Sequence, residues 1–483
     1  MSPIPMTTQV LKTTPADRTS RNASAPRRVP PSPPGSFLMG HAGEMLRDPA
    51  QFLLQAHASY GDVVRLRLGP RVALALFHPD HIHHVLVKHR ENYTKQARGY
   101  KKLRQVIGNG LVTSEGDFWL RQRRLMQPAF APVRLAGFAA AIVTAAEQVA
   151  QSWELAARQG ESIDAADEMM RLTMRIVGET LLGTDVTGDA NEVGAALSFV
   201  LDEVSRRIHT PWDFREKLPL ARNRRYKRSI ERLNRSVQKI IVEHRAGTAG
   251  SGDLLTMMMA ARDEETGTQM SDQQLRDEVM TFFLAGHETT AKALTWTFYL
   301  LSQHVEVRSR LEREVDAVLA GRSATAADLP KLVYAKQVIQ ESMRLYPPVW
   351  GIARMTAEED QIGDVTIPAG APVLLAQYVT HRHRGFWDNP EGFDPDRFLP
   401  ERSEGRHPYA YFPFGAGPRI CIGNHFALIE SVLILATITS RWSLNLIPGR
   451  PVIPEARVTL RPKHGLFMAP ERRSSRTSRS SGV

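Results

Sequence analysis

The sequence predicts a mainly α-helical fold, with one large helical domain and small β regions near its two ends. Apolar residues recur at helical spacing through most of residues 116–345. Short runs with β-type patterning lie before and after that region. The 483 residues are 42% hydrophobic and 23% charged, which supplies enough apolar material for a sizeable core.

Composition and charge separate two tails from this domain. Residues 1–34 are rich in Pro and Arg, residues 471–483 are basic, and both have the composition of disordered chain. The two tails carry +7 of the net charge of +11, so the body, residues 35–470, is nearly balanced. We therefore interpret the positive charge as solvated chain ends and expect no nucleic-acid partner.

The elements of the domain are expected in the following order. Residues 61–79, "GDVVRLRLGPRVALALFHP", predict a hairpin, because Gly-Pro interrupts their β-type patterning. Amphipathic patterns predict helices at residues 135–159 and 224–246. Residues 364–379 read as short strands and loops, and residues 457–470 as a last strand pair.

Targeting signals and membrane spans are not apparent in the sequence. No run of about 18 apolar residues occurs, and the N-terminus has no apolar signal core. The single cysteine, Cys421, excludes a disulfide framework within the chain and a zinc site of several thiolates. We therefore expect a cytoplasmic protein without a transmembrane segment.

Cys421 lies in the stretch "FGAGPRICIG", residues 414–423, which is followed by a helix-like apolar run. Glycines allow the backbone to fold tightly, so that amide N–H groups can point at the sulfur. The positive N-terminal end of the following helix favours a thiolate. These features suit a cysteine that binds iron, whereas a lone cysteine in a glycine-rich turn is more often buried and inert.

A long helix is predicted to begin at Ser271, where Gln274 completes a capping-box pattern. The helix is apolar almost all round, so we expect it to be buried. Its centre is "AGHETT", residues 285–290. A glycine inside a helix and an acid in a buried position each reduce the stability of the fold. Taken alone, Glu288 is equally well interpreted as a solvated or paired side chain.

The ten residues of "FGAGPRICIG" match the haem-binding loop of the cytochrome P-450 superfamily, the haem-thiolate monooxygenases, position for position. Four further stretches agree in order and spacing, so the chain resembles this family over residues 35–470. The resemblance implies a triangular, helix-rich prism that holds haem b, iron protoporphyrin IX. It makes Cys421 the axial iron ligand and assigns cofactor contacts in the loop to Phe414, Gly415, Arg419 and Gly423.

The resemblance also assigns roles to the centre of the long helix. It implies that the Thr289 hydroxyl bonds to iron-bound dioxygen and that Glu288 feeds protons. Ala285 and Gly286 would leave room for oxygen and substrate above the haem. His287 is one place out of the matched pattern, so we expect it to face away from the iron.

Several charged residues outside these two stretches match family positions as well. "QESMRLYPP" and "FDPDRF" resemble the parts of a structural network behind the haem, formed by Glu341, Arg344 and Arg397. Cations are expected on the two haem propionates, and the residues that match these contacts are Trp119, Arg123, Arg354 and Arg419. On a helix, Trp119 and Arg123 share one face, while Arg121 and Arg124 lie on the opposite, exposed side.

The resemblance implies insertion of one O2-derived oxygen atom into an apolar substrate such as a fatty acid, terpenoid or polyketide. Sixty-two residues follow Cys421, which leaves no room for a fused flavin domain. Electrons from NAD(P)H are therefore expected through a separate ferredoxin with its reductase, or a flavodoxin, that docks at Arg121 and Arg124. We expect a monomer.

Pocket positions are implied around residues 95–112, 195–215, 281–289, 348–353 and 464–468. The side chains expected there are Val349, Trp350, Ile352, Leu466, Phe467 and Met468. Two other interpretations stay open at this point. One is a haem-thiolate enzyme that uses peroxide, or that isomerises or dehydrates its substrate. The other is a non-catalytic haem sensor.

Overall fold

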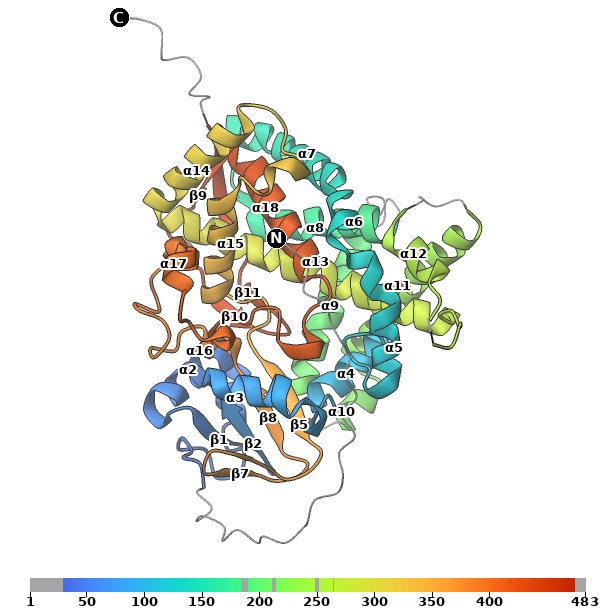
Figure 1. Cartoon of the computed structure of the whole chain (residues 1–483), viewed down its shortest axis with the longest axis vertical. Helices are drawn as coiled ribbons and strands as arrows, with labels where there is room; N and C mark the ends of the chain where they lie inside the picture. Colours follow the sequence, from blue (N-terminus) through green and yellow to red (C-terminus); the bar gives the residue numbers. More distant parts are fainter. Residues whose placement is uncertain (1–28, 184–189, 211–213, 248–251, 264, 474–483) are drawn as a thin grey trace, which may run out of the picture.

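The computed structural model describes residues 29–183, 190–210, 214–247, 252–263 and 265–473. Long helices make up most of this part of the chain, and the strands form small sheets. Figure 1 shows strands β1, β2, β5 and β8 gathered at one end of the molecule, with long helices making up most of the remainder. The predicted mainly helical fold is confirmed.

The helices follow the chain in order. They are α1 (Ala42–Arg47), α2 (Pro49–Tyr60), α3 (Pro79–His83), α4 (Arg98–Ile107), α5 (Gly116–Met126), α6 (Pro132–Ala136), α7 (Ala139–Gln159), α8 (Ala165–Leu181), α9 (Ala190–His209), α10 (Phe214–Lys217), α11 (Ala221–Arg245), α12 (Leu254–Ala260), α13 (Asp272–Gln303), α14 (Val305–Leu319), α15 (Val333–Leu345), α16 (Gln377–Thr380), α17 (Pro400–Ser403) and α18 (Asn424–Thr439).

The strands are short and belong to four sheets. They are β1 (Val63–Leu68), β2 (Arg71–Leu76), β3 (Tyr93–Thr94), β4 (Ile163–Asp164), β5 (Ile352–Thr356), β6 (Asp360–Ile362), β7 (Val365–Ile367), β8 (Pro372–Leu375), β9 (Trp442–Leu446), β10 (Pro454–Ala456), β11 (Leu460–Pro462) and β12 (Phe467–Arg472). The largest sheet has the order β1-β2-β8-β5-β3. The smaller ones are β10-β11, β4-β12-β9 and β6-β7.

The expected hairpin is β1 and β2, which pair antiparallel from Val63 opposite Leu76 to Leu68 opposite Arg71. Gly69 turns the chain with φ 64°, a left-handed conformation that glycine adopts without strain. β8 then adds parallel to β2 and antiparallel to β5. This arrangement brings residues after 350 beside the N-terminal hairpin.

Helix α13 is the centre of the fold and packs against α8, α11, α15 and α18. Its start is the predicted capping box: Ser271 Oγ accepts from Gln274 N at 3.3 Å, and Gln274 Oε1 accepts from Ser271 N at 2.7 Å. Most residues of the helix are buried on all sides, so the expectation of a buried central helix is confirmed.

Two strands form near the expected residues 457–470, but the expectation that they pair with each other is wrong. β11 pairs with β10, whereas β12 pairs with β4 and β9. The cause lies far away in the sequence: Leu466 N donates to Asp164 Oδ1 at 2.9 Å, and Ala165 N donates to Leu466 O at 2.8 Å. These bonds attach the start of β12 to the β4–α8 junction instead of to β11.

Folded structure extends past both expected domain boundaries. Pro31 O accepts a hydrogen bond from Arg65 N at 2.8 Å, so the end of the N-terminal tail lies along β1. At the other end, β12 continues past residue 470, and Arg473 forms an ion pair with Asp316 at 2.7 Å. The remaining tail predictions concern residues 1–28 and 474–483, which lie outside the described residues.

Within the described residues, the stretch Pro132–Gln159 is long and apolar enough to cross a membrane by length and composition. In this fold the stretch is divided into α6 and α7, and α7 packs against α18, α8 and β12. Its buried residues include Ile142 and Trp153, both nearly inaccessible to solvent. This packing is that of a helix in the protein core.

Candidate active site

A cavity of about 300 Å³ lies beside the middle of α13 and above the segment that carries Cys421. The Cys421 side chain is exposed to this cavity. Much of the wall is apolar, contributed by Leu111, Val112, Leu181, Phe282, Ala293, Val349 and Ile352. A thiol at one end of an apolar chamber is therefore the first feature of the site.

Two glycines with left-handed backbone shape the loop before the thiol. Gly415 has φ 74° and Gly417 has φ 65°. A Cβ atom on Gly417 would lie 2.2 Å from Leu86 O, so the loop rests directly on neighbouring backbone. Cys421 N donates to Phe414 O at 2.9 Å and closes the loop. The glycines thus hold the sulfur at one position.

The surroundings of Cys421 act on its charge in opposite directions. Burial raises the pKa of the thiol, while the Gly423 N–H and the Arg123 guanidinium lower it by a smaller amount. Helix α18 begins at Asn424, so its positive end lies beside the sulfur. A metal ion is a stronger influence than any of these, because a coordinating thiol is deprotonated outright.

Four cationic side chains line the cavity: Lys95, Arg123, Arg354 and Arg419. Arg419 donates to Ser114 O at 2.8 Å, and its guanidinium lies 3.7 Å from the centre of the Trp119 ring. Arg123 donates to Ile420 O at 2.8 Å. The cations are held in place by backbone oxygens and by an aromatic face.

The other two cations are nearly buried. Arg354 is 6% exposed and donates to Tyr100 Oη at 2.9 Å, and Lys95 is 8% exposed and donates to Val112 O at 2.7 Å. Burial lowers the pKa of Lys95 well below its usual value, and the charges of Arg419 and Arg354 add to this effect. Burial and Arg354 also lower the pKa of Arg419 to about 10.

The positive charge of the cavity lining favours binding of an anion. No Asp or Glu is among the described residues that line the cavity, so its cations repel one another, and the nearby Glu115 offsets this only in part. Haem carries two propionates and an iron that binds a thiolate. The residues present therefore fit haem: Cys421 would hold the iron, and Lys95, Arg123, Arg354 and Arg419 would hold the propionates.

On α13, Ala285, Gly286 and Thr289 line the cavity. Thr289 Oγ1 donates to Ala285 O at 2.8 Å, a bond from residue i to i−4 within the helix. Packing also explains why residue 286 is glycine, because a Cβ atom there would lie 3.0 Å from Val177 Cγ2 on α8. Glycine thus permits the close approach of α13 and α8 beside the chamber.

Glu288 and His287 are not among the residues that line the cavity. Glu288 Oε1 accepts from Thr459 Oγ1 at 2.7 Å, between β10 and β11. Burial raises the pKa of Glu288, and the nearby Lys292 partly offsets this. His287 Nδ1 lies 2.6 Å from Phe283 O within the helix, and burial lowers its pKa to about 4.

Glu341, Arg344 and Arg397 lie together in the protein interior. Arg344 contacts both oxygens of Glu341, at 2.6 and 2.7 Å, and Arg397 Nε lies 3.3 Å from Glu341 Oε1. Arg344 also donates to the carbonyl oxygens of His381 and Pro390, at 3.0 and 2.6 Å. The pair ties α15 to the loops that precede the cysteine segment.

A model of the family described as cytochrome P450 matches residues 30–469. The chain belongs to the cytochrome P-450 family. Haem iron is therefore its cofactor, and it works with redox partner proteins on an apolar substrate.

Three relatives from Streptomyces are similar to this P-450 over most of their length. Cyclooctatin synthase of Streptomyces melanosporofaciens is 40% identical over 92% of this chain and 95% of its own. Cyclooctat-9-en-7-ol 5-monooxygenase of the same organism is 39% identical over 90% and 92%. Pentalenene oxygenase of Streptomyces avermitilis is 36% identical over 90% and 94%.

A solved structure agrees with the fold of this P-450. The crystal structure of the cytochrome P-450DA haem domain has a TM-score of 0.84 and 28% sequence identity, and it covers 93% of this chain and 99% of that chain. With the named monooxygenase and oxygenase among its relatives, this P-450 is a haem-thiolate monooxygenase.

The expected pocket of this P-450 is correct only in part. Val349 and Ile352 line the cavity, as do residues within 95–112 and 281–289. Trp350 does not, because its indole donates to Arg457 O at 2.8 Å within a separate apolar cluster. The described residues of 195–215 and 464–468 contribute no lining either, so the expected Leu466, Phe467 and Met468 lie elsewhere.

The expectation of two exposed cations on α5 is correct only in part, because both side chains are partly exposed and one of them is paired. Arg124 forms ion pairs with Asp263, at 3.1 Å, and with Glu265. Arg121 is only partly exposed and lies 3.4 Å from Thr268 Oγ1. The segment between α12 and α13 folds against α5, a long-range contact that helical periodicity does not reveal.

The sequence interpretation missed Lys95 as a cavity cation, although residues 95–112 were expected to reach the pocket. A charge is ordinarily exposed, and only the fold shows that this one is buried among other cations. Its partner Val112 lies 17 residues away, beyond the range of local patterns.

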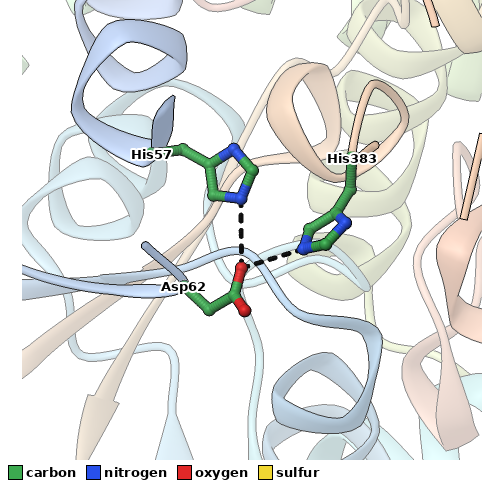
Figure 2. Close-up of side chains that lie close together, drawn as sticks. All are labelled: His57, Asp62 and His383. Carbon is green, nitrogen blue, oxygen red and sulfur yellow. Dashed lines mark hydrogen bonds and ion pairs between the residues drawn. The ribbon is translucent and has the colours of Figure 1, made fainter. Parts of the chain in front are cut away.

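Figure 2 shows a second group of chemically interesting residues, away from the cavity. His57 Nε2 and His383 Nε2 lie 3.0 and 2.9 Å from Asp62 Oδ1. His383 Nδ1 accepts from Gly385 N at 3.0 Å, so its proton is on Nε2 and is donated to Asp62. A histidine that binds a metal ion through one ring nitrogen usually donates a hydrogen bond from the other. His383 does not fit this pattern, because its Nδ1 accepts a hydrogen bond. We therefore interpret this group as a hydrogen-bonded clamp between α2 and the loop after α16.

Proposed function

We propose that this P-450 oxygenates a cyclic terpenoid, either a hydrocarbon or an alcohol. The observation that carries the proposal is the largely apolar chamber above Cys421, together with 36–40% identity to enzymes named for cyclooctatin, cyclooctat-9-en-7-ol and pentalenene. Among fatty acids, polyketides and terpenoids, the last class agrees best with these names. All four cavity cations would hold the haem propionates, which would leave no cation for a fatty-acid carboxylate.

The residues have the following proposed roles. Bound haem supplies the oxidation of the substrate by O2, which inserts one oxygen atom and reduces the other to water. Cys421 provides the axial thiolate, and the four cavity cations orient the cofactor. Ala285 and Gly286 leave space beside it. Thr289 holds a proton at Oγ1 on the cavity side of α13.

Glu288 is proposed to supply protons to that side. Its carboxyl is held on the opposite side by Thr459, so a rotation of the side chain is required to bring it toward Thr289. The raised pKa of Glu288 favours the protonated form that such a role needs.

We further propose that electrons come from NAD(P)H through a ferredoxin and its reductase or through a flavodoxin, and that the enzyme is a cytoplasmic monomer. Similarity to the monooxygenase and the oxygenase of Streptomyces supports the use of redox partners. Docking of an acidic carrier on the face behind Cys421 predicts a reduction rate that falls with added salt.

The test is a spectral titration of the holoenzyme with pentalenene and, as a comparison, with lauric acid. Binding that displaces iron-bound water shifts the Soret band. We expect saturable shifts with pentalenene, and an oxygenated product when ferredoxin, reductase and NADPH are added. A saturable shift and product with lauric acid alone would refute the terpenoid assignment.

A further inference from the structure

A short loop forms part of the cavity wall, and two acids of α13 bind its backbone. The loop, residues 108–113, joins α4 to the approach to α5, and its Leu111 and Val112 line the cavity. Asn109 N donates to Asp277 Oδ2 at 2.7 Å, and Leu111 N donates to Glu278 Oε2 at 2.9 Å.

The fit between the loop and α13 requires glycine at two positions. A Cβ atom on Gly108 would lie 2.1 Å from Asp277 Oδ1, and one on Gly110 would lie 2.2 Å from Thr281 Oγ1. Residues 277 and 281 are four apart and therefore share one face of the helix. The "GNG" sequence lets the backbone lie directly against that face.

Both acids are themselves held in place. Asp277 Oδ1 accepts from Arg276 Nη1 and from Gln273 Nε2, each at 2.8 Å. Glu278 is 1% exposed, and burial raises its pKa to about 8. A neutral carboxyl still has a carbonyl oxygen, so it accepts from Leu111 N whether or not it carries a proton.

The far side of the loop is attached to the cations of the haem site. Lys95 Nζ donates to Val112 O at 2.7 Å, and just beyond the loop Arg419 Nη1 donates to Ser114 O at 2.8 Å. The loop thus spans from α13 to the residues that would hold the propionates. Its position determines how far Leu111 and Val112 extend into the cavity.

We infer that Asp277 and Glu278 are positioning residues for substrate selection, because they hold the 108–113 loop in the cavity wall. They do not touch the cavity themselves, so they act through Leu111 and Val112. The inference rests on the apolar-substrate function proposed above. Removing an acceptor would leave a buried N–H without a partner, which favours opening of the loop.

The test compares two substitutions at one position in the holoenzyme. Glu278→Gln keeps an acceptor oxygen, whereas Glu278→Met has a similar shape and no such acceptor. Glu430→Met removes another buried acid, on α18, and serves as the control. Carbon monoxide spectra and melting temperatures first establish that each variant folds and holds haem.

We expect amide hydrogen exchange in residues 108–113 to be on the order of tenfold faster in Glu278→Met than in the wild type. Glu278→Gln and Glu430→Met should exchange there as the wild type does. We also expect Glu278→Met to weaken 1-phenylimidazole relative to imidazole by about fivefold or more. Both azoles bind haem iron, but only the larger one reaches the wall.

Two results would overturn the inference. One is equal exchange in the Met and Gln variants, which would show that Glu278 does not hold the loop. The other is faster exchange with an unchanged azole ratio, which would show that the loop does not shape the cavity. If the wild type converted no terpenoid, the proposed substrate class would fail, but these two measurements would still decide the role of Glu278.

Discussion

Thr459 donates a 2.7 Å hydrogen bond to Glu288, across 171 residues of sequence. The bond holds the acid of "AGHETT" on the side of α13 that faces the β10–β11 hairpin, with Lys292 nearby. Oε2 of the same carboxyl has no hydrogen-bond partner among the described residues. The carboxyl of Glu288 is thus buried and has a raised pKa, and only one of its two oxygens accepts a hydrogen bond within the described residues. These properties suit a group that changes its hydrogen-bond partner during turnover.

If Glu288 delivers protons, Glu288→Gln removes the proton and keeps the shape. We expect product formation to fall by about tenfold or more, and the solvent deuterium isotope effect to rise. The measurement is the product formation rate in H2O and D2O under saturating reductase. Glu401→Gln, an exposed acid of α17, is the control. Equal rates in the Glu288 variant and the control would contradict the role.

Thr289 is expected to control how efficiently electrons are used. Thr289→Ala removes the hydroxyl that now donates to Ala285 O inside the cavity wall. NAD(P)H consumption should continue while product per NAD(P)H falls several-fold and peroxide accumulates. Thr289→Ser retains the hydroxyl and should recover much of the coupling. Unchanged coupling in the Ala variant would be inconsistent with the proposed proton at Oγ1.

Cys421 is expected to be the iron ligand. In the reduced wild type, carbon monoxide should produce the strongly red-shifted Soret band of a thiolate complex. Cys421→Ser, which replaces the thiolate by a weaker ligand, should lose that band and its turnover. A Ser variant that kept the shifted band would exclude Cys421, the only cysteine in the chain.

Glu430 predicts a pH dependence of stability. This acid of α18 is fully buried, and burial raises its pKa from 4.5 to about 8. Between these values the folded protein keeps a proton that the unfolded chain has released, so raising the pH favours unfolding. Glu430→Gln cannot ionise and escapes this loss.

The expected difference can be measured by urea unfolding of the holoenzyme at several pH values. From pH 5 to pH 8 the free energy of unfolding of the wild type should fall relative to Glu430→Gln by on the order of a few kcal/mol. Above pH 8 the folded state also releases the proton. The difference in unfolding free energy should therefore grow only slightly further and then level off. Glu404→Gln, an exposed acid, should show no such trend. Parallel stability curves for wild type and Glu430→Gln would contradict the prediction.

Features that depend on nearby residues were predictable from sequence. The Ser271 capping box, the β1–β2 hairpin and the "FGAGPRICIG" loop are each formed by residues that are close together in the sequence. In each case the structure forms the cap, turn or loop that the pattern indicates. Contacts over long separations were not predictable. The β12 strand, attached through Asp164, and Arg124, paired with Asp263, are the clearest examples.

The sequence by itself determined the helical fold class, the lone cysteine in its glycine loop and the resemblance to the P-450 family. Those properties depend on residue type and local spacing, which a linear chain displays directly. Only the tertiary structure decided that Lys95 joins the cavity cations, that Glu288 faces Thr459 and that Glu278 binds the 108–113 loop. Each of these is a buried polar contact between distant segments, and its partner is selected by packing and by the cost of leaving a polar group unpaired.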